Sequence, residues 1–232
     1  MSGAYFDQFK VVGLIVLTNS SMMMIIAAIV VLLLFRGAQL IPDRWQSIIE
    51  SIYAHFHGVV KDNLGSEGLK YFAFIISLFF FIVFLNMLGL FPYVFTPTVH
   101  IVVTLGLSFS IIIGVTLAGL WGFEWDFFSI LMPGGAPLGL APLLVLIETV
   151  SYMSRAISLG VRLAANLSAG HLLFAILAGF GFNLLMVNGL VGFFPLLIMV
   201  FITLLEVAVA VIQAYVFCLL TTIYLADTIV LH

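Results

Sequence analysis

The chain has 232 residues, of which 64% are hydrophobic and only 7% are charged, and its mean hydropathy is +1.34. No soluble domain of this size is so apolar, so the composition predicts an integral membrane protein and no nucleic-acid partner. The net charge of −3 indicates little, because the charges are spread over a mostly buried surface. A single cysteine, Cys218, excludes a disulfide framework within the chain. No nucleotide loop, metal spacing or nucleophile motif occurs, so we expect no catalytic site, cofactor or metal.

The first segments predict one membrane-crossing helix followed by a surface helix. Residues 11–35 form an apolar run that is interrupted by the polar sequence TNSS. The next segment, 36–70, holds four of the seven basic residues, and its apolar residues recur at helical spacing. That pattern favours an amphipathic helix over 42–65 lying on the membrane, with a soluble hairpin as the alternative. His55 and His57 diverge on a helix, which favours solvated histidines over a metal site.

The remaining chain predicts four further membrane helices. Apolar runs cover 71–91 and 99–121, and a Pro/Gly-rich connection over 122–139 leads to two long apolar stretches, 140–178 and 190–229. The first of these would be ~58 Å long as a helix, nearly twice the hydrocarbon thickness of a bilayer. An average tilt cannot accommodate that length, so we expect a steeply tilted hairpin. Breaking each stretch into two spans is the alternative, and the absence of charged loops argues against it.

These elements predict an all-α fold with five membrane-crossing helices and one amphipathic surface helix, in a single membrane domain over 1–232. Within the first long stretch, Arg162 is a fixed charge at membrane depth, because arginine does not lose its proton in proteins. Such a charge costs roughly 2.5–3.5 kcal/mol at the bilayer centre, so it usually faces a cavity or partner and marks an ion pathway. Arg155 fits two interpretations equally well. It is either an arginine near a helix end whose side chain reaches the membrane surface, or a member of the same helical face as Arg162. Small residues around Arg162 indicate either static packing or the close passage of another helix.

The polar run also carries a family resemblance. The sequence SRAISLGVRLAANLSAGHLLF, followed downstream by LLEVAVAVIQAYVFCLLTTIYLAD, resembles subunit a of F-type ATP synthases, and most closely the mitochondrial form. The similarity extends over nearly the whole chain, including GLFPYVFTPTVH, and the tail YLADTIVLH resembles fungal members. In bacterial relatives the acid and the imidazole look exchanged between the two helices. Here His171 precedes Glu206, which is the mitochondrial arrangement.

The resemblance implies a proton-translocating stator subunit in the mitochondrial inner membrane. Its partners would be a rotating ring of c subunits, other stator subunits and the lipid bilayer. The resemblance implies the same tilted pair of helices. The basic residues of 36–70 indicate that this segment lies on the inner side. The N-terminus would then face the intermembrane space and the C-terminus the matrix.

In an antiparallel hairpin the intramembrane polar residues form ordered pairs. These are Glu148 with Asp227 on the inner side, Arg162 with Gln213 at the centre beside Asn166, and His171 with Glu206 on the outer side. Carboxylates and imidazoles can relay protons, and the central arginine interrupts a direct leak between the two sides. This is the layout that two offset half-channels need. A buried structural hydrogen bond is the alternative for His171 and Glu206, and His171 lies ~180° around the helix from Arg162.

Two other classes of membrane protein are alternatives to this interpretation. A proton-coupled secondary transporter would also use intramembrane Arg, Glu and His, but it should show internal repeats and discontinuous half-helices, and the sequence has no such repeat. A non-conducting membrane scaffold would leave the isolated Arg162 and its polar neighbours without an explanation.

Overall fold

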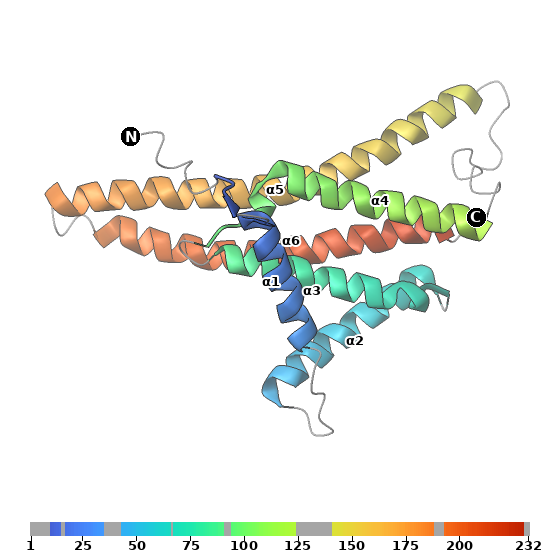
Figure 1. Ribbon diagram of the computed structural model, residues 1–232, viewed down its shortest axis with the longest axis horizontal. Coiled ribbons are helices and arrows are strands. Elements are labelled where there is room, and N and C mark those ends of the chain that lie inside the picture. Colours follow the sequence, from blue (N-terminus) through green and yellow to red (C-terminus); the bar gives the residue numbers. More distant parts are fainter. Residues whose placement is uncertain are drawn as a thin grey trace. The chain divides into compact units, whose positions relative to one another are not determined.

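The computed structural model describes residues 10–14, 17–34, 43–65, 67–90, 94–123, 141–187 and 193–229. Its helices are α1 Asn19–Leu34, α2 Arg44–Leu64, α3 Phe72–Gly89, α4 Ile101–Phe123, α5 Ala141–Val187 and α6 Phe193–Ile229 (Figure 1). Two short 3-10 helices, η2 Glu67–Tyr71 and η3 Pro97–Val99, precede α3 and α4. Two-residue strands, β1 Gly13–Leu14 and β2 Leu17–Thr18, pair antiparallel before α1. The predicted all-α fold is confirmed.

Four described segments are long and apolar enough to cross a membrane. They are Gly68–Gly89, Ile101–Trp121, Pro142–Met186 and Phe194–Thr228. The apolar helix α1 has only 16 residues, which gives it a length of ~24 Å against a hydrocarbon core of ~30 Å. The membrane class is therefore confirmed, and the number of five crossings stays a prediction.

Helix α1 begins at Asn19, eight residues after the expected start of the first span at Val11. The reason is a reciprocal cap: the Ser21 amide donates to the Thr18 hydroxyl at 3.4 Å, and the Thr18 amide donates to the Ser21 hydroxyl at 3.0 Å. Such bonds satisfy amides that have no partner at a helix N-terminus. The polar run that interrupts the apolar sequence is therefore the place where the helix starts.

Helix α2 occupies the place of the expected amphipathic helix. It ends at Leu64, and the next residue, Gly65, has a φ of 65°, in the left-handed region that glycine adopts without strain. Its buried strip is Phe56, Val60 and Leu64, whereas Ile48 in the first half is 53% exposed. The strip is thus confined to the second half of the helix.

Aromatic contacts attach α2 to its neighbours. The ring of Phe56 lies 4.6 Å from that of Phe79 and 5.7 Å from that of Tyr215 on α6. His55 Nε2 lies 3.2 Å from the Tyr215 hydroxyl. His55 is exposed, as expected of a surface histidine, and it also contacts α6.

Helix α5 continues through the expected joint to Val187, because GFGFNLLMV is apolar enough to remain helical. Its 47 residues and the 37 of α6 correspond to ~70 Å and ~55 Å, so neither could cross a ~30 Å core upright. Steep tilt stays a prediction. The expected connection over 124–139, the end of the span over 91–93, the turn over 188–192 and the tail over 230–232 lie outside the described residues.

The chain divides into two compact units. Unit 1 comprises Met1–Leu34, Phe80–Thr104 and Arg162–Ala214, and unit 2 comprises Phe35–Phe79, Leu105–Val161 and Tyr215–His232. Each unit has its own buried side chains, such as Leu85 and Leu163 in unit 1 and Phe56 and Ile75 in unit 2. Helices α3 to α6 each contribute to both units, and the expected single domain over 1–232 stays a prediction.

Candidate functional site

In unit 1, α5 and α6 pack as an antiparallel pair (Figure 1). Asn166 Nδ2 on α5 donates a hydrogen bond to Gln213 Oε1 on α6 at 3.0 Å. Four residues further along α5, Gly170 lies against the carboxylate of Glu206, which comes earlier in α6. Residue numbers thus rise on one helix as they fall on the other, and the antiparallel hairpin expected from the sequence is observed here.

The central pair differs from the expected one by one helical turn. The spacing of the polar residues predicts Gln213 at the level of Arg162, whereas in the structure Gln213 is hydrogen-bonded to Asn166. Gln213 is only 5% exposed, so its side-chain oxygen needs a donor from the protein, and the amide of Asn166 supplies one. Arg162 instead lies on the exposed side of α5.

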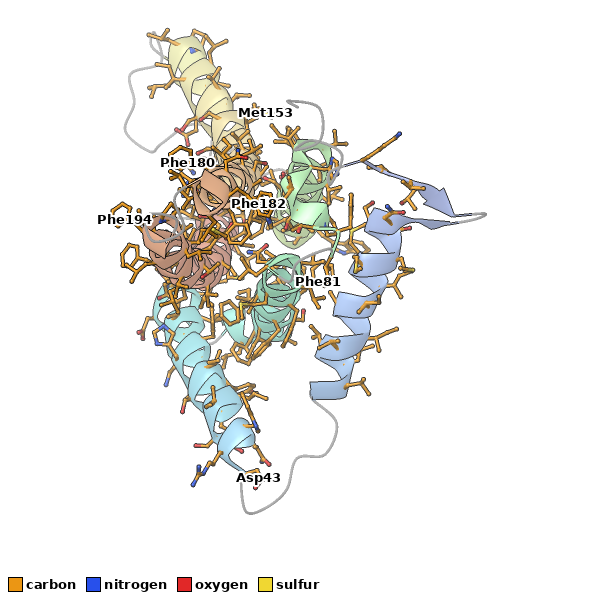
Figure 2. All side chains as sticks on the ribbon, turned by 90° about the vertical axis from the view of Figure 1, so that its left-hand side faces the viewer. Asp43, Phe81, Met153, Phe180, Phe182 and Phe194 are labelled. Atoms are coloured by element: carbon orange, nitrogen blue, oxygen red, sulfur yellow. The ribbon has the colours of Figure 1, made fainter. Side chains whose placement is uncertain are left out.

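An exposed line of residues runs along α5, and we name it the α5 stripe. Its members recur at a spacing of three or four residues: Arg162, Ala165, Asn166, Ala169, Leu173, Ile176 and Phe180. The opposite side of this helix is buried, with Leu163 and Leu167 at 0% and 2% exposure. Phe180 at the end of this stripe is exposed, as are Phe182 and Phe194 of the same unit, which Figure 2 labels. The small side chains beside Arg162 leave room for another helix to approach closely.

Glu206 lies on the packed side of the hairpin. It is 7% exposed, and its Oε1 has no hydrogen-bond partner. A Cβ added to Gly170 would collide with this oxygen, so the absence of a side chain at Gly170 makes room for the carboxylate.

His171, which follows Gly170, is held from another element. Its Nε2 lies 3.5 Å from the Thr96 hydroxyl, which in turn donates to the carbonyl of Gly89 at 3.3 Å. The tautomer of the His171 ring decides which of these two atoms donates. Glu206 Oε1 has no hydrogen-bond partner among the described residues, and the pairing of His171 with Glu206 stays a prediction.

Asn86 on α3 is a polar residue of unit 1 to which the sequence analysis assigned no role. It is 0% exposed, and its Nδ2 donates to the backbone carbonyl of Ala210 on α6 at 3.2 Å. Ala210 lies between Glu206 and Gln213 on the buried face of α6. One signal was available in the sequence: an asparagine near the end of an otherwise apolar span.

Buried polar atoms without a partner gather in unit 1. In the part of the chain that the structure describes they are Asn86 Oδ1, Thr98 Oγ1, His100 Nε2, Glu206 Oε1 and Gln213 Nε2. All five belong to unit 1. Such atoms are uncommon in folded proteins, and each one asks for an explanation such as a bound water molecule.

The inner acids belong to unit 2, where an arginine lies between them. Arg155 contacts Asp227 at 3.3 Å and Glu148 at 3.9 Å, and its guanidinium lies 5.8 Å from the ring centre of Tyr224. The side chains of Arg155 and Glu148 are 36% and 39% exposed, and that of Asp227 is 52% exposed. Exposed ion pairs of this kind contribute little to stability.

The sequence model of the family described as ATP synthase A chain matches residues 17–226. The chain belongs to this family. It is 76% identical over 232 residues to an ATP synthase subunit a from Metridium senile, and the match covers all of both chains. It is 51% identical to the subunit from Mycosarcoma maydis over 84% of this chain and 78% of the relative, and 44% identical to that from Brassica napus over 97% and 96%.

The family expected from the resemblance is thereby confirmed. With it, the function as the proton-translocating stator subunit of the membrane sector of ATP synthase is confirmed at that level. The expectation that the tail marks a fungal form stays a prediction. The identity to the chain from Metridium senile exceeds that to the chain from Mycosarcoma maydis.

The fit between Gly170 and Glu206 gives a test of the site. Gly170→Ala should push the carboxylate aside and lower proton flux about tenfold or more, because misplacing a reacting group by ~1 Å is costly. Gly106→Ala on α4 is the matched control, since its Cβ would meet no atom within 4 Å. Both changes favour helix formation equally. Proton flux per assembled complex in vesicles is the measurement, and equal flux in the two variants would contradict the placement of Glu206.

Proposed function

We propose that this chain carries protons across the mitochondrial inner membrane through two offset half-channels that open toward a c-ring. The observation that carries this proposal is the arrangement within unit 1. A permanent positive charge, Arg162, lies on the exposed α5 stripe, and a buried acid, Glu206, lies on the packed side of the same hairpin. The rotating ring would meet Arg162 on the α5 stripe. Protons would reach the ring through the packed side of the hairpin, where Glu206 lies.

At the ring, Arg162 acts as an electrostatic switch. A cation beside a carboxylate favours the ionised form of that carboxylate, so a protonated ring acid arriving at Arg162 gives up its proton. Arginine cannot carry the proton itself, because its guanidinium stays charged. Arg162 therefore separates the two half-channels, and Ala165 and Ala169 let the ring helix come near.

On the outer side, His171 and Glu206 load the next ring acid. Both groups exchange protons readily when their surroundings favour it. Support comes from the position of Glu206 against Gly170 and from the Thr96 hydroxyl beside His171 Nε2. The two groups then act in sequence along one path, joined by an intermediate carrier.

On the inner side, Glu148 and Asp227 release the proton, with Arg155 between them. Carboxylates are suitable groups to accept a proton that leaves the ring. The basic residues in 36–70 support an inner, matrix location for this end of the chain, with the N-terminus in the intermembrane space. The exposed charges of α2 would suit contacts with other stator subunits.

Disulfide cross-linking tests the proposed ring interface. Ala169→Cys, on the α5 stripe, should cross-link under mild oxidation to a cysteine placed on the acid-bearing helix of the ring. Leu167→Cys, two residues away and 2% exposed, is the matched control and should not react. The native Cys218 is buried and would not compete. Equal cross-linking at both positions, or none at Ala169, would refute this interface.

A further inference from the structure

His100 is a part-buried histidine of unit 1 that the proposed function leaves without a task. It follows η3, and its backbone carbonyl accepts hydrogen bonds from the amides of Val103 and Thr104 at 3.0 and 3.2 Å, where α4 begins. Its ring stacks on that of Phe95, with the ring centres 5.2 Å apart and the planes at 24°. The Nε2 atom of His100 is buried and has no hydrogen-bond partner among the described residues. The residue is thus held in place while one ring nitrogen stays unpartnered.

The segment that carries His100 is attached to α5 at two points. Thr96 Oγ1, just before η3, lies 3.5 Å from His171 Nε2. The hydroxyl of Ser168 donates to the carbonyl of Val99 at 3.2 Å. A 3-10 helix rises ~2.0 Å per residue, so the four steps from Thr96 to His100 span ~8 Å. The segment therefore connects His100 to the surroundings of His171 over a short distance.

Packing alone does not explain the unpartnered nitrogen. A ring that only filled space beside Phe95 would be better supplied by phenylalanine, because burying a polar atom without a hydrogen bond is unfavourable. An imidazole differs from a phenyl ring in taking up and releasing protons near neutral pH. The hydroxyl of Thr98, a residue that is 1% exposed, is also unpartnered in the described part of the chain. Two polar groups of one short segment thus lack the bonds that a purely structural role would give them.

We propose that His100 is a proton-carrying residue of the outer half-channel, which takes protons from the outer side and passes them toward His171. The inference deepens the proposed function, on which it rests, by naming a further residue that exchanges protons. The step is balanced: the neutral ring takes up one proton from the outer phase, and the resulting imidazolium releases one proton toward His171 and becomes neutral again. Phe95 is a positioning residue, because it orients the ring and exchanges no proton itself.

The test makes one substitution at two histidines in the whole complex, reconstituted in vesicles under an imposed proton gradient. His100→Phe keeps an aromatic ring against Phe95 and removes the exchanging nitrogen. We expect it to lower ATP synthesis per assembled complex on the order of tenfold, less than the roughly 100-fold of an indispensable acid–base group, because some protons reach His171 without it. His57→Phe is the matched control and should synthesise ATP normally, since His57 is also part-buried and contacts an aromatic ring, that of Phe72 at 5.6 Å. A wild-type rate in His100→Phe would overturn the proposal.

Chemical rescue separates proton exchange from packing. His100→Ala leaves a space that a small ring can enter. Imidazole, at equal concentration on both sides of the membrane, should restore part of the ATP synthesis that this variant loses. Pyrazole has the same size and is not protonated near neutral pH, so it should restore none, and His57→Ala should respond to neither ring. Equal restoration by the two rings would indicate that His100 only fills space, and restoration by neither would also refute its role as a proton carrier.

Two further measurements keep the outcomes distinct. If His100→Phe does not assemble, His100→Gln takes its place, because its side chain is polar and does not titrate, and the same loss is expected. Cross-linking of Ala169→Cys to the ring is measured with and without His100→Phe. Absence of the cross-link in both would refute the proposed function. A cross-link in both, together with a wild-type rate of ATP synthesis, would refute only the part assigned to His100.

Discussion

Arg162→Ala is expected to abolish ATP-driven proton pumping while leaving the complex assembled. Arg162 lies on the exposed α5 stripe, so truncating it removes a charge from the surface without opening the core of unit 1. Under the proposed function, loss of this charge removes what makes a ring acid release its proton and what keeps the half-channels apart. Passive leak through the membrane sector should therefore rise as pumping falls. Acidification of vesicles on addition of ATP, together with subunit composition, is the measurement.

Arg162→Lys should also be severely impaired, because a compact ammonium lacks the planar, delocalised charge of a guanidinium and can lose its proton when buried. Arg44→Ala, at the exposed start of α2, removes the same positive charge elsewhere and should pump normally. Near-normal pumping by the lysine variant would show that any cation suffices and would refute a specific role for the guanidinium.

The exchange of His171 and Glu206 should give a non-additive result. His171→Glu alone places two acids beside Gly170, and Glu206→His alone leaves two imidazoles and no acid. We expect each single variant to lose most proton flux and the double exchange to recover part of it, because one acid and one imidazole are present again. Coupled residues behave in this way, whereas distant ones have additive effects. Proton flux is compared in wild type and the three variants.

The structure sharpens this second prediction. Since His171 contacts Thr96 and Glu206 packs against Gly170, the coupling should run through carriers in the path and not through a direct bond. Thr96→Val, which cannot hydrogen-bond to the imidazole, should therefore lower flux with Glu206 left in place. Strictly additive losses in the exchange series would mean that the two groups serve separate paths.

The helices of this fold were predictable because apolar runs of membrane length occur between polar segments. The errors have local causes. Thr18 and Ser21 looked like an interruption, but their hydroxyls cap α1. The glycines near 180 looked like a turn, but glycine is common in membrane helices and α5 continues to Val187.

The candidate site was predictable in its residue types and less so in its contacts. An intramembrane arginine and acid stand out in any apolar sequence, which is why Arg162 and Glu206 were found. The register between helices depends on packing, so Gln213 was matched with Arg162 and not with Asn166. The contact of Asn86 was not predicted, because its hydrogen bond to the α6 backbone depends on how the helices pack, which no periodicity reveals.

The aromatic contacts of α2 have a mechanical consequence. A stator must stay still while its partner turns, so any torque applied to the hairpin needs a counterforce. Helix α2 contacts α6 at Tyr215 through Phe56 and His55. Its polar side carries exposed charges, among them Arg44, Glu50 and Lys61, and stator subunits that bind this side would hold the helix in place. We expect helix α2 to act as a lateral brace for α6. Weakening these contacts should lower the coupling of the motor under load before it lowers proton conduction at rest.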